Sequence, residues 1–233
     1  DGGLISWGNW GTANAVTGLS LKAGGTISHF WWSNDLSGTI SLNDGLWHHV
    51  MATFDGTVRK VLPDGSTEIV AHELGVACGL AFGSDGTMFV GDRSGTVFRV
   101  GASAHVVPFV SLPPSLAAFH LAMGPGDALY VTAPTMATYD HVYRIDRQGA
   151  VTIVASGFGR PQGMAVDEGG ALYVVDAVAG GAGLYRVREG APRELVVAAN
   201  ALVGVAFDPR GGLVVASNDT LYRFDNGLRP WRA

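Results

Sequence analysis

Hydrophobic and polar residues alternate in a pattern that repeats about every 42 residues through most of the chain. Four short apolar segments resemble one another, and their last residues, at positions 82, 123, 166 and 207, are 41, 43 and 41 positions apart. A cluster of Gly, Asp or Pro follows each segment, as in Gly83-Ser84-Asp85-Gly86. Such clusters make tight hairpin turns, so each segment is predicted to be a strand that leads into a hairpin.

Each repeat continues with further short apolar segments. The second strand is predicted to begin at Met88, Leu129, Leu172 and Leu213. In the third strand an aromatic residue precedes an arginine at the same place each time, in Phe98-Arg99, Tyr143-Arg144, Tyr185-Arg186 and Tyr222-Arg223. A fourth strand is predicted at residues 106–110, 151–155 and 194–198. Four short strands per repeat of this length are typical of propeller blades, so residues 61–224 predict an all-β, β-propeller fold.

The first quarter of the chain does not match the repeat, although it also reads as strands, at residues 4–7, 19–22, 26–32, 39–42 and 47–54. In one interpretation residues 47–54, 57–62 and 67–71 are three strands of a first blade. Residues 26–32 or 39–42 then supply its fourth strand, so that residues 1–233 form a single propeller of five blades. In the other, residues 1–56 are an appended sheet or a dimerisation patch beside four blades. We favour five blades.

Composition narrows the classes of partner. The chain has 34 glycines and only 15% charged residues, which suits short strands and tight turns and not disorder. The net charge is −5 and the longest basic run is Arg59-Lys60, which argues against a nucleic-acid partner. No apolar stretch approaches the roughly 20 residues of a membrane span, which argues against a membrane partner. Cys78 is the only cysteine, so an intrachain disulfide is excluded.

Residues 42–56, Leu-Asn-Asp-Gly-Leu-Trp-His-His-Val-Met-Ala-Thr-Phe-Asp-Gly, resemble a marker segment of laminin-G-like, concanavalin-type jelly rolls. The resemblance covers residues 1–60, which is only the middle of such a domain. It implies that a laminin-G-like fragment is joined to the blades near residues 59–62 and completes the ring. This partial domain, together with a chain that begins at Asp1 without Met, favours an engineered or recombined chimera.

The blades are similar to the gluconolactonase/senescence-marker/NHL superfamily, through residues 76–92, 119–134 and 159–176. The resemblance implies a central funnel and one divalent cation held by a Glu, an Asn and an Asp. Here the positions before the four innermost strands are predicted to be Cys78, His120, Gln162 and Val203, so those ligands are not matched. We therefore predict no metal and no other cofactor. A softer ion such as zinc would need Cys78, His120 and a third ligand.

Candidate site residues cluster where the innermost strands begin. His120 is a potential general base or ligand, or else a hydrogen-bonded histidine that lines the funnel. Gln162 can hydrogen-bond a ligand, and Cys78 is either a nucleophile or a small buried hydrophobe. Asp92 and Asp176 end equivalent second strands, as acid/base groups or as turn caps.

The loop over residues 134–141 is longer than its counterparts in the first and fourth repeats. Long loops on a rigid scaffold commonly carry recognition, so Tyr139, Asp140 and His141 are predicted ligand contacts.

Two functions compete. The favoured one is a non-catalytic scaffold that binds at most a small molecule or glycan in the central funnel. The alternative is a lactone hydrolase with an atypical site around His120, Gln162 and Asp176. Self-association is a further expectation, because an incomplete ring can close by pairing between subunits.

Overall fold

The computed structural model describes residues 56–62, 64–101, 104–137, 139–178, 181–208 and 211–224, and the backbone of five earlier strands, at residues 6–8, 16–22, 26–31, 36–41 and 50–52. The chain divides into two compact units, Asp1–Ala77 (unit 1) and Cys78–Ala233 (unit 2). Apart from one 3-10 turn at Pro125–Asp127, every regular element in the described part of the chain is a β-strand, which confirms the all-β prediction.

Unit 1 contains two antiparallel sheets. The first joins four strands in sequence order, and the second joins three. Their bounds are β1 (Ser6–Gly8), β2 (Val16–Lys22), β3 (Thr26–Trp31) and β4 (Leu36–Ser41), then β5 (Val50–Ala52), β6 (Val58–Val61) and β7 (Thr67–Ala71).

The strands predicted in this region exist, but one prediction about their pairing is wrong. Residues 26–32 or 39–42 were expected to complete the sheet of β5, β6 and β7, whereas β3 and β4 pair with each other and β3 pairs with β2. Consecutive hairpin partners close a sheet locally, without a long connection, and this local pairing prevails. The ends of the predicted strand at residues 47–54 lie outside the described residues.

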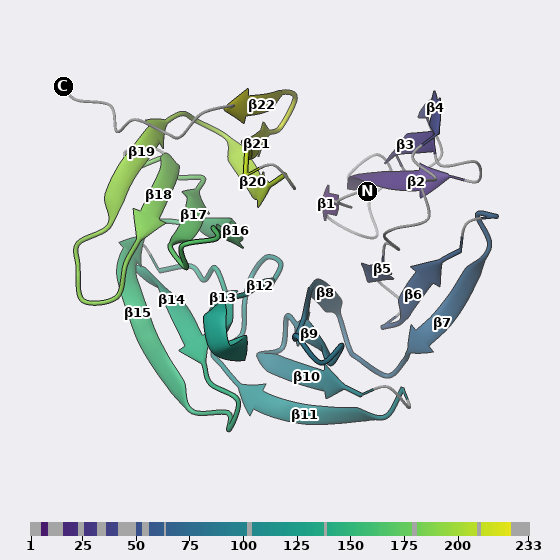
Figure 1. Cartoon of the computed structure of the whole chain (residues 1–233), viewed down its shortest axis with the longest axis horizontal. Coiled ribbons are helices and arrows are strands. Elements are labelled where there is room, and N and C mark those ends of the chain that lie inside the picture. Colours follow the sequence, from purple (N-terminus) through teal and green to yellow (C-terminus); the bar gives the residue numbers. More distant parts are fainter. Residues whose placement is uncertain are drawn as a thin grey trace. The chain divides into compact units, whose positions relative to one another are not determined.

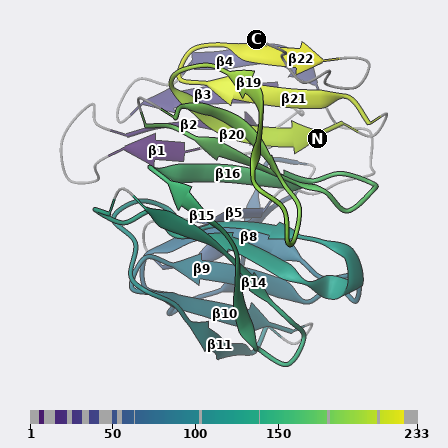
Figure 2. The same cartoon turned by 90° about the vertical axis from the view of Figure 1, so that its left-hand side faces the viewer.

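Unit 2 contains four sheets, each built from consecutive strands of one repeat (Figure 1). The first has β8 (Ala77–Phe82), β9 (Met88–Asp92), β10 (Thr96–Val100) and β11 (Val106–Ser111), and Figure 2 shows these four side by side in this order. The other strands are β12 (His120–Met123), β13 (Leu129–Thr132), β14 (Asp140–Ile145) and β15 (Val151–Phe158); β16 (Pro161–Val166), β17 (Leu172–Asp176), β18 (Gly183–Val187) and β19 (Glu194–Ala198); and β20 (Leu202–Phe207), β21 (Leu213–Ser217) and β22 (Leu221–Phe224).

The first strands of successive sheets, β12, β16 and β20, lie next to one another, so they are the innermost strands of unit 2. Apolar side chains fill the space between neighbouring sheets. In β17, Leu172 and Val174 pack towards the preceding sheet, while Tyr173 and Val175 pack towards the following one. All five residues of β17 are buried, as expected for a strand that is covered on both faces. The four-stranded repeat predicted from the sequence is therefore present in three sheets, and β20–β22 form a three-stranded fourth.

Candidate functional site

The candidate residues lie at one end of unit 2, where the innermost strands begin and the second strands end. We call this end the mouth face. In an antiparallel sheet, the start of the first strand, the end of the second and the start of the third meet at the same edge. The described residues of the loops that join these ends therefore all lie there, at 93–95, 112–119, 133–137, 139, 159–160, 177–178, 181–182, 199–201 and 218–220. Cys78, His120 and Gln162 come from three successive sheets of this face.

The thiol of Cys78 is part of the fold and not a free nucleophile. Its Sγ accepts a hydrogen bond from the backbone N–H of Phe119, at 3.3 Å, which links the first sheet to the second. Burial raises the pKa of the thiol to about 11, and the nearby charge of Asp92 acts in the same direction. The thiolate is the reactive form, so Cys78 is unreactive at neutral pH. Of the two roles considered for this residue, the structure favours the small buried group.

His120 lies at the start of β12, opposite Thr132 of β13. Burial lowers the pKa of the imidazole to about 4, and a side-chain hydrogen bond with Gln162 opposes that shift. Its Nε2 atom is shielded from solvent and has no hydrogen-bond partner in the structure. His120 is therefore neutral at physiological pH and presents one unsatisfied ring nitrogen.

The strand register corrects the predicted equivalence of these residues. His120 pairs with Thr132, and Gly204 pairs with Ala216, at the same place in the second and fourth sheets. His120 therefore matches Gly204 and, by the repeat spacing, Gly79 and Gly163, whereas Cys78, Gln162 and Val203 match Phe119. None of the three predicted pre-strand positions Cys78, Gln162 and Val203 precedes its strand; each lies within it.

The glycines that match His120 allow neighbouring innermost strands to approach closely. A Cβ added at Gly79 would lie 2.1 Å from the carbonyl oxygen of Phe119, and one at Gly163 would lie 2.9 Å from the Cα of Gly204. In the second sheet His120 stands at the matching position, and the contact with the neighbouring sheet is made by other atoms. There Thr132, which is fully buried, donates from Oγ1 to the carbonyl oxygen of Gln162 at 2.9 Å, beside the imidazole. Sequence reasoning missed Thr132, although the break in the glycine pattern marks this place.

The two aspartates that end second strands hold the backbone in place. Asp176 is 1% exposed, and its carboxylate accepts the N–H groups of Gly159 at 2.9 Å and Arg160 at 2.8 Å. It also lies 3.8 Å from the guanidinium of Arg193. Asp92 is buried at the equivalent place and accepts a short hydrogen bond from Ser94. Both carboxylates therefore act as turn caps, the second of the roles considered for them.

The predicted contact loop separates into a buried and an exposed part. Asp140 is buried and accepts hydrogen bonds from the backbone N–H of Thr135 at 3.0 Å and from its hydroxyl at 2.5 Å. The ring of His141 lies between the rings of Tyr139 and Tyr143, and its Nδ1 is 2.8 Å from the hydroxyl of Ser156. Only Tyr139 is strongly exposed, so it is the member of this group that a ligand can reach directly.

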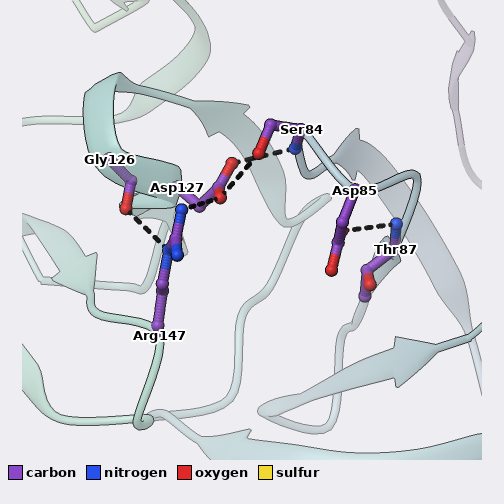
Figure 3. Close-up of polar contacts among 6 residues, drawn as sticks. All are labelled: Ser84, Asp85, Thr87, Gly126, Asp127 and Arg147. Atoms are coloured by element: carbon purple, nitrogen blue, oxygen red, sulfur yellow. Dashed lines mark hydrogen bonds and ion pairs between the residues drawn. The ribbon is translucent and has the colours of Figure 1, made fainter.

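The opposite end of unit 2 carries a polar bridge that sequence reasoning also missed (Figure 3). Asp127 accepts hydrogen bonds from the backbone N–H and the hydroxyl of Ser84, each at 2.8 Å, and pairs with Arg147. Those hydrogen bonds, with the one from Arg147, hold the pKa of the Asp127 carboxyl below its usual range. Asp127 adopts a positive φ of 55°, at a position where the other repeats have Gly86, Gly170 and Gly211.

A cavity of about 210 Å³ also opens at this opposite end, between the second and third sheets. Tyr130, Leu172, Arg188 and Glu189 are among the residues that line it, and none of the predicted site residues does.

The superfamily resemblance implies one divalent cation, and the predicted donors at the mouth face do not fit a hard cation such as calcium. Calcium takes six to eight oxygen ligands, and among Cys78, His120 and Gln162 only the amide offers a side-chain oxygen. The described residues include no group of three or more His, Cys, Asp or Glu side chains placed to hold a metal ion. No helix in the described part of the chain is long and apolar enough to cross a membrane.

Successive four-stranded antiparallel sheets around adjacent innermost strands define the class of fold, a β-propeller. The chain is similar in structure to a catalytically inactive variant of virginiamycin B lyase from Staphylococcus aureus with quinupristin, at 13% identity, a TM-score of 0.57 and coverage of 96% of this chain and 88% of that one. A gluconolactonase from Xanthomonas campestris is 18% identical, with a TM-score of 0.65, and the match covers 76% of this chain and 68% of that one. Regucalcin, a calcium-binding protein from Agrobacterium tumefaciens, is 17% identical, with a TM-score of 0.61, and the match covers 90% of this chain and 70% of that one.

At these identities the likeness establishes the fold alone. No family model matches the chain, and no curated protein does. The fold is thus shared with gluconolactonase-like, lyase and calcium-binding propeller proteins.

Proposed function

We propose that unit 2 binds a small, neutral, hydroxyl-bearing ring, a sugar or its lactone, at His120 and Gln162 on the mouth face, with Cys78 on the neighbouring sheet, and does not convert it. The observation that carries the proposal is the Nε2 atom of His120, which is buried without a hydrogen-bond partner. A buried polar atom left unpaired costs about 1–3 kcal/mol, so a hydroxyl that reaches this nitrogen gains free energy.

The charges of the site support a neutral ligand. At pH 7 the thiol of Cys78 is protonated and the imidazole of His120 is neutral, because their pKa values are about 11 and about 4. The side chain of Gln162 is an amide. Asp176 is buried and occupied by backbone N–H groups, so it is poorly placed to act as an acid or base. A general base works best with a pKa near the working pH, which favours binding over catalysis here.

Lactone hydrolysis is the second candidate. It is favoured by the likeness in fold to a gluconolactonase. In this chain His120 would take the proton from an attacking water, with Gln162 beside it.

We further propose that the strands of unit 1 belong to the same propeller, and that residues 1–60 supply blade strands as a laminin-G-like fragment. The alignments to whole propellers support the first part, because a streptogramin B lyase structure covers 98% of this chain at a TM-score of 0.60 and 12% identity. A single cooperative thermal transition of the 233-residue chain is expected, and two separate transitions would contradict it.

Calorimetric titration with glucose, methyl glucoside and glucono-δ-lactone tests the proposed function, alongside a hydrolysis assay with calcium, zinc or EDTA. The informative variant is His120→Gly, because glycine is the residue at the matching positions 79, 163 and 204. Asp127→Asn, at the opposite end of the same hairpin, is the matched control.

We expect binding of at least one ring that weakens about tenfold in His120→Gly and is unchanged in Asp127→Asn. Turnover that disappears in His120→Gly would establish the hydrolase instead. Binding of none of the three compounds would overturn the proposal.

A further inference from the structure

The loops of the mouth face are poor in charge and rich in exposed apolar side chains. Their charged residues are Arg93, Arg160 and Asp219, and Arg93 donates from its guanidinium to the carbonyl oxygen of Leu116 at 2.9 Å. Four large apolar side chains of these loops are exposed: Leu116 by 56%, Met136 by 85%, Tyr139 by 65% and Val178 by 38%. We call these four residues the apolar rim.

The rim is held together by contacts between its loops. The backbone N–H of Leu116 donates to the carbonyl oxygen of Pro134 at 2.9 Å, and the hydroxyl of Ser115 donates to the same oxygen at 2.7 Å. This fixes the loop of Leu116 against the loop of Met136.

The other two members of the rim lie beside the next connection along the chain. A Cβ built at Gly157 would be 3.3 Å from the ring of Tyr139, and one at Gly159 would be 3.0 Å from Val178. The rim therefore follows the connections that lead into β12 and β16.

The position of the rim relates it to the candidate site. The loop of Leu116 ends at His120, and the connection between Gly157 and Arg160 leads to Gln162. The loops that carry or contact the rim therefore lead, along the chain, into the strands of the candidate site. Ligand sites are lined mainly by apolar side chains with a few polar groups, so we consider the apolar rim together with the polar residues of the candidate site.

We propose that the ligand is amphipathic: its hydroxyl-bearing ring reaches His120 and Gln162, and an alkyl or aryl substituent covers the apolar rim. This inference rests on the proposed function and adds the class of ligand. The rim would contribute affinity by burying apolar surface, and the ring would fix orientation through hydrogen bonds. The buried state of Asp92, Asp140 and Asp176 fits such a ligand, since these carboxylates are withdrawn from the surface that an alkyl chain would cover.

Calorimetric titration with methyl, butyl, hexyl and octyl β-glucosides, below their micellar concentrations, tests the inference. The affinity is expected to rise about two- to fourfold for each added methylene until the rim is covered. Leu116→Ser and Met136→Ser should reduce the gain from the longer chains by about fivefold and leave the affinity for methyl glucoside unchanged. Ile153→Ser is the matched control, because Ile153 is 54% exposed but lies on β15, away from these loops.

The outcomes separate the two proposals. If methyl glucoside binds and chain length has no effect, the amphipathic ligand is overturned while the proposed function stands. If the chain-length gain persists in both rim variants, or falls equally in Ile153→Ser, the rim is not the apolar subsite. If none of the glucosides binds to the wild-type protein and glucono-δ-lactone does not bind either, the proposed function itself fails.

Discussion

The two ends of unit 2 are built from the same repeat, yet they present opposite chemistry. At the mouth face the charged loop residues are few and three aspartates are buried. At the opposite end most of the turns carry charges: Asp85, Asp127, Asp146, Arg147, Asp167, Glu168, Arg188, Glu189 and Asp208. Some of these form ion pairs, as Arg147 does with Asp127.

The difference shows where recognition can reside on a repetitive scaffold. The charged end is typical of a solvated surface and is tied together by exposed polar contacts, each of which contributes little. At the mouth face, the backbone approaches closely and the polar groups are buried, so that single substitutions have larger effects. The second sheet departs from the glycine pattern at both ends, with His120 at one and Asp127 at the other, and these departures allow the comparison to be tested.

The largest expected effect is that of Gly79→Ala at the mouth face. The φ of Gly79 is +84°, and an added Cβ would lie 2.1 Å from the carbonyl oxygen of Phe119. Overpacking against backbone and a left-handed conformation together predict a loss of about 3–5 kcal/mol in the free energy of unfolding. Gly86→Ala is the control, because Gly86 has a φ of +81° with open space around its Cβ at the opposite end. Chemical denaturation should show a loss of only about 1 kcal/mol there. Equal losses in the two variants would remove the distinction between the ends.

Asp176→Ala is expected to be nearly as damaging. It leaves the N–H groups of Gly159 and Arg160 unpaired and removes the carboxylate near Arg193, all in a buried setting. The predicted loss is about 3 kcal/mol in the free energy of unfolding. Asp85→Ala, which removes an exposed carboxylate hydrogen-bonded to Thr87 at the opposite end, should be close to the wild type in the same denaturation experiment. A small loss for Asp176→Ala would mean that its two amides find other partners.

Much of the fold could be predicted because its signal is local and repeated. The position of each apolar run fixes a strand of unit 2, and Gly, Asp and Pro fix the hairpins between strands. The pairing of β3 with β2 and β4 was not predictable in this way, since residues 1–56 do not follow the repeat and the choice between sheets depends on tertiary contacts.

The site was less predictable than the fold. The sequence identified His120 but grouped it with Cys78, Gln162 and Val203 as a position before an innermost strand. The strand register, like the repeat spacing, instead matches His120 with Gly79, Gly163 and Gly204. From the sequence, Asp176 was a possible acid/base group and Asp140 a possible ligand contact, and only the structure shows that both accept hydrogen bonds from backbone N–H groups. The pKa values of Cys78 and His120 depend on burial, which no local motif reports.

A third test uses the pH dependence of stability. Burial lowers the pKa of His120 from about 6.5 to about 4 in the folded protein, so the unfolded chain binds more protons between these values. Stability due to His120 is therefore fully present above pH 6.5 and falls as the pH drops to 4, by at most about 3 kcal/mol. His120→Gln should lack this contribution. Thermal melts from pH 7.5 to 4 would measure it, and equal slopes for the wild type and the variant would show that His120 does not titrate in this window.

The smallest expected effect is at the charged end, where Asp127 bridges Ser84 and Arg147 (Figure 3). Because its folded pKa is lowered, the carboxylate stabilises the protein above the unfolded pKa of about 3.9, and this contribution is lost as the pH falls through the folded value. Asp127→Asn should lower the melting temperature at pH 7 by about 1–3 °C, and by less in 1 M salt, since exposed pairs are screened. Asp127→Gly relieves the positive φ but loses all three hydrogen bonds. A melting temperature for Asp127→Gly above that of the wild type would show that the backbone strain outweighs the bridge, and that the aspartate is kept at this turn for something other than stability.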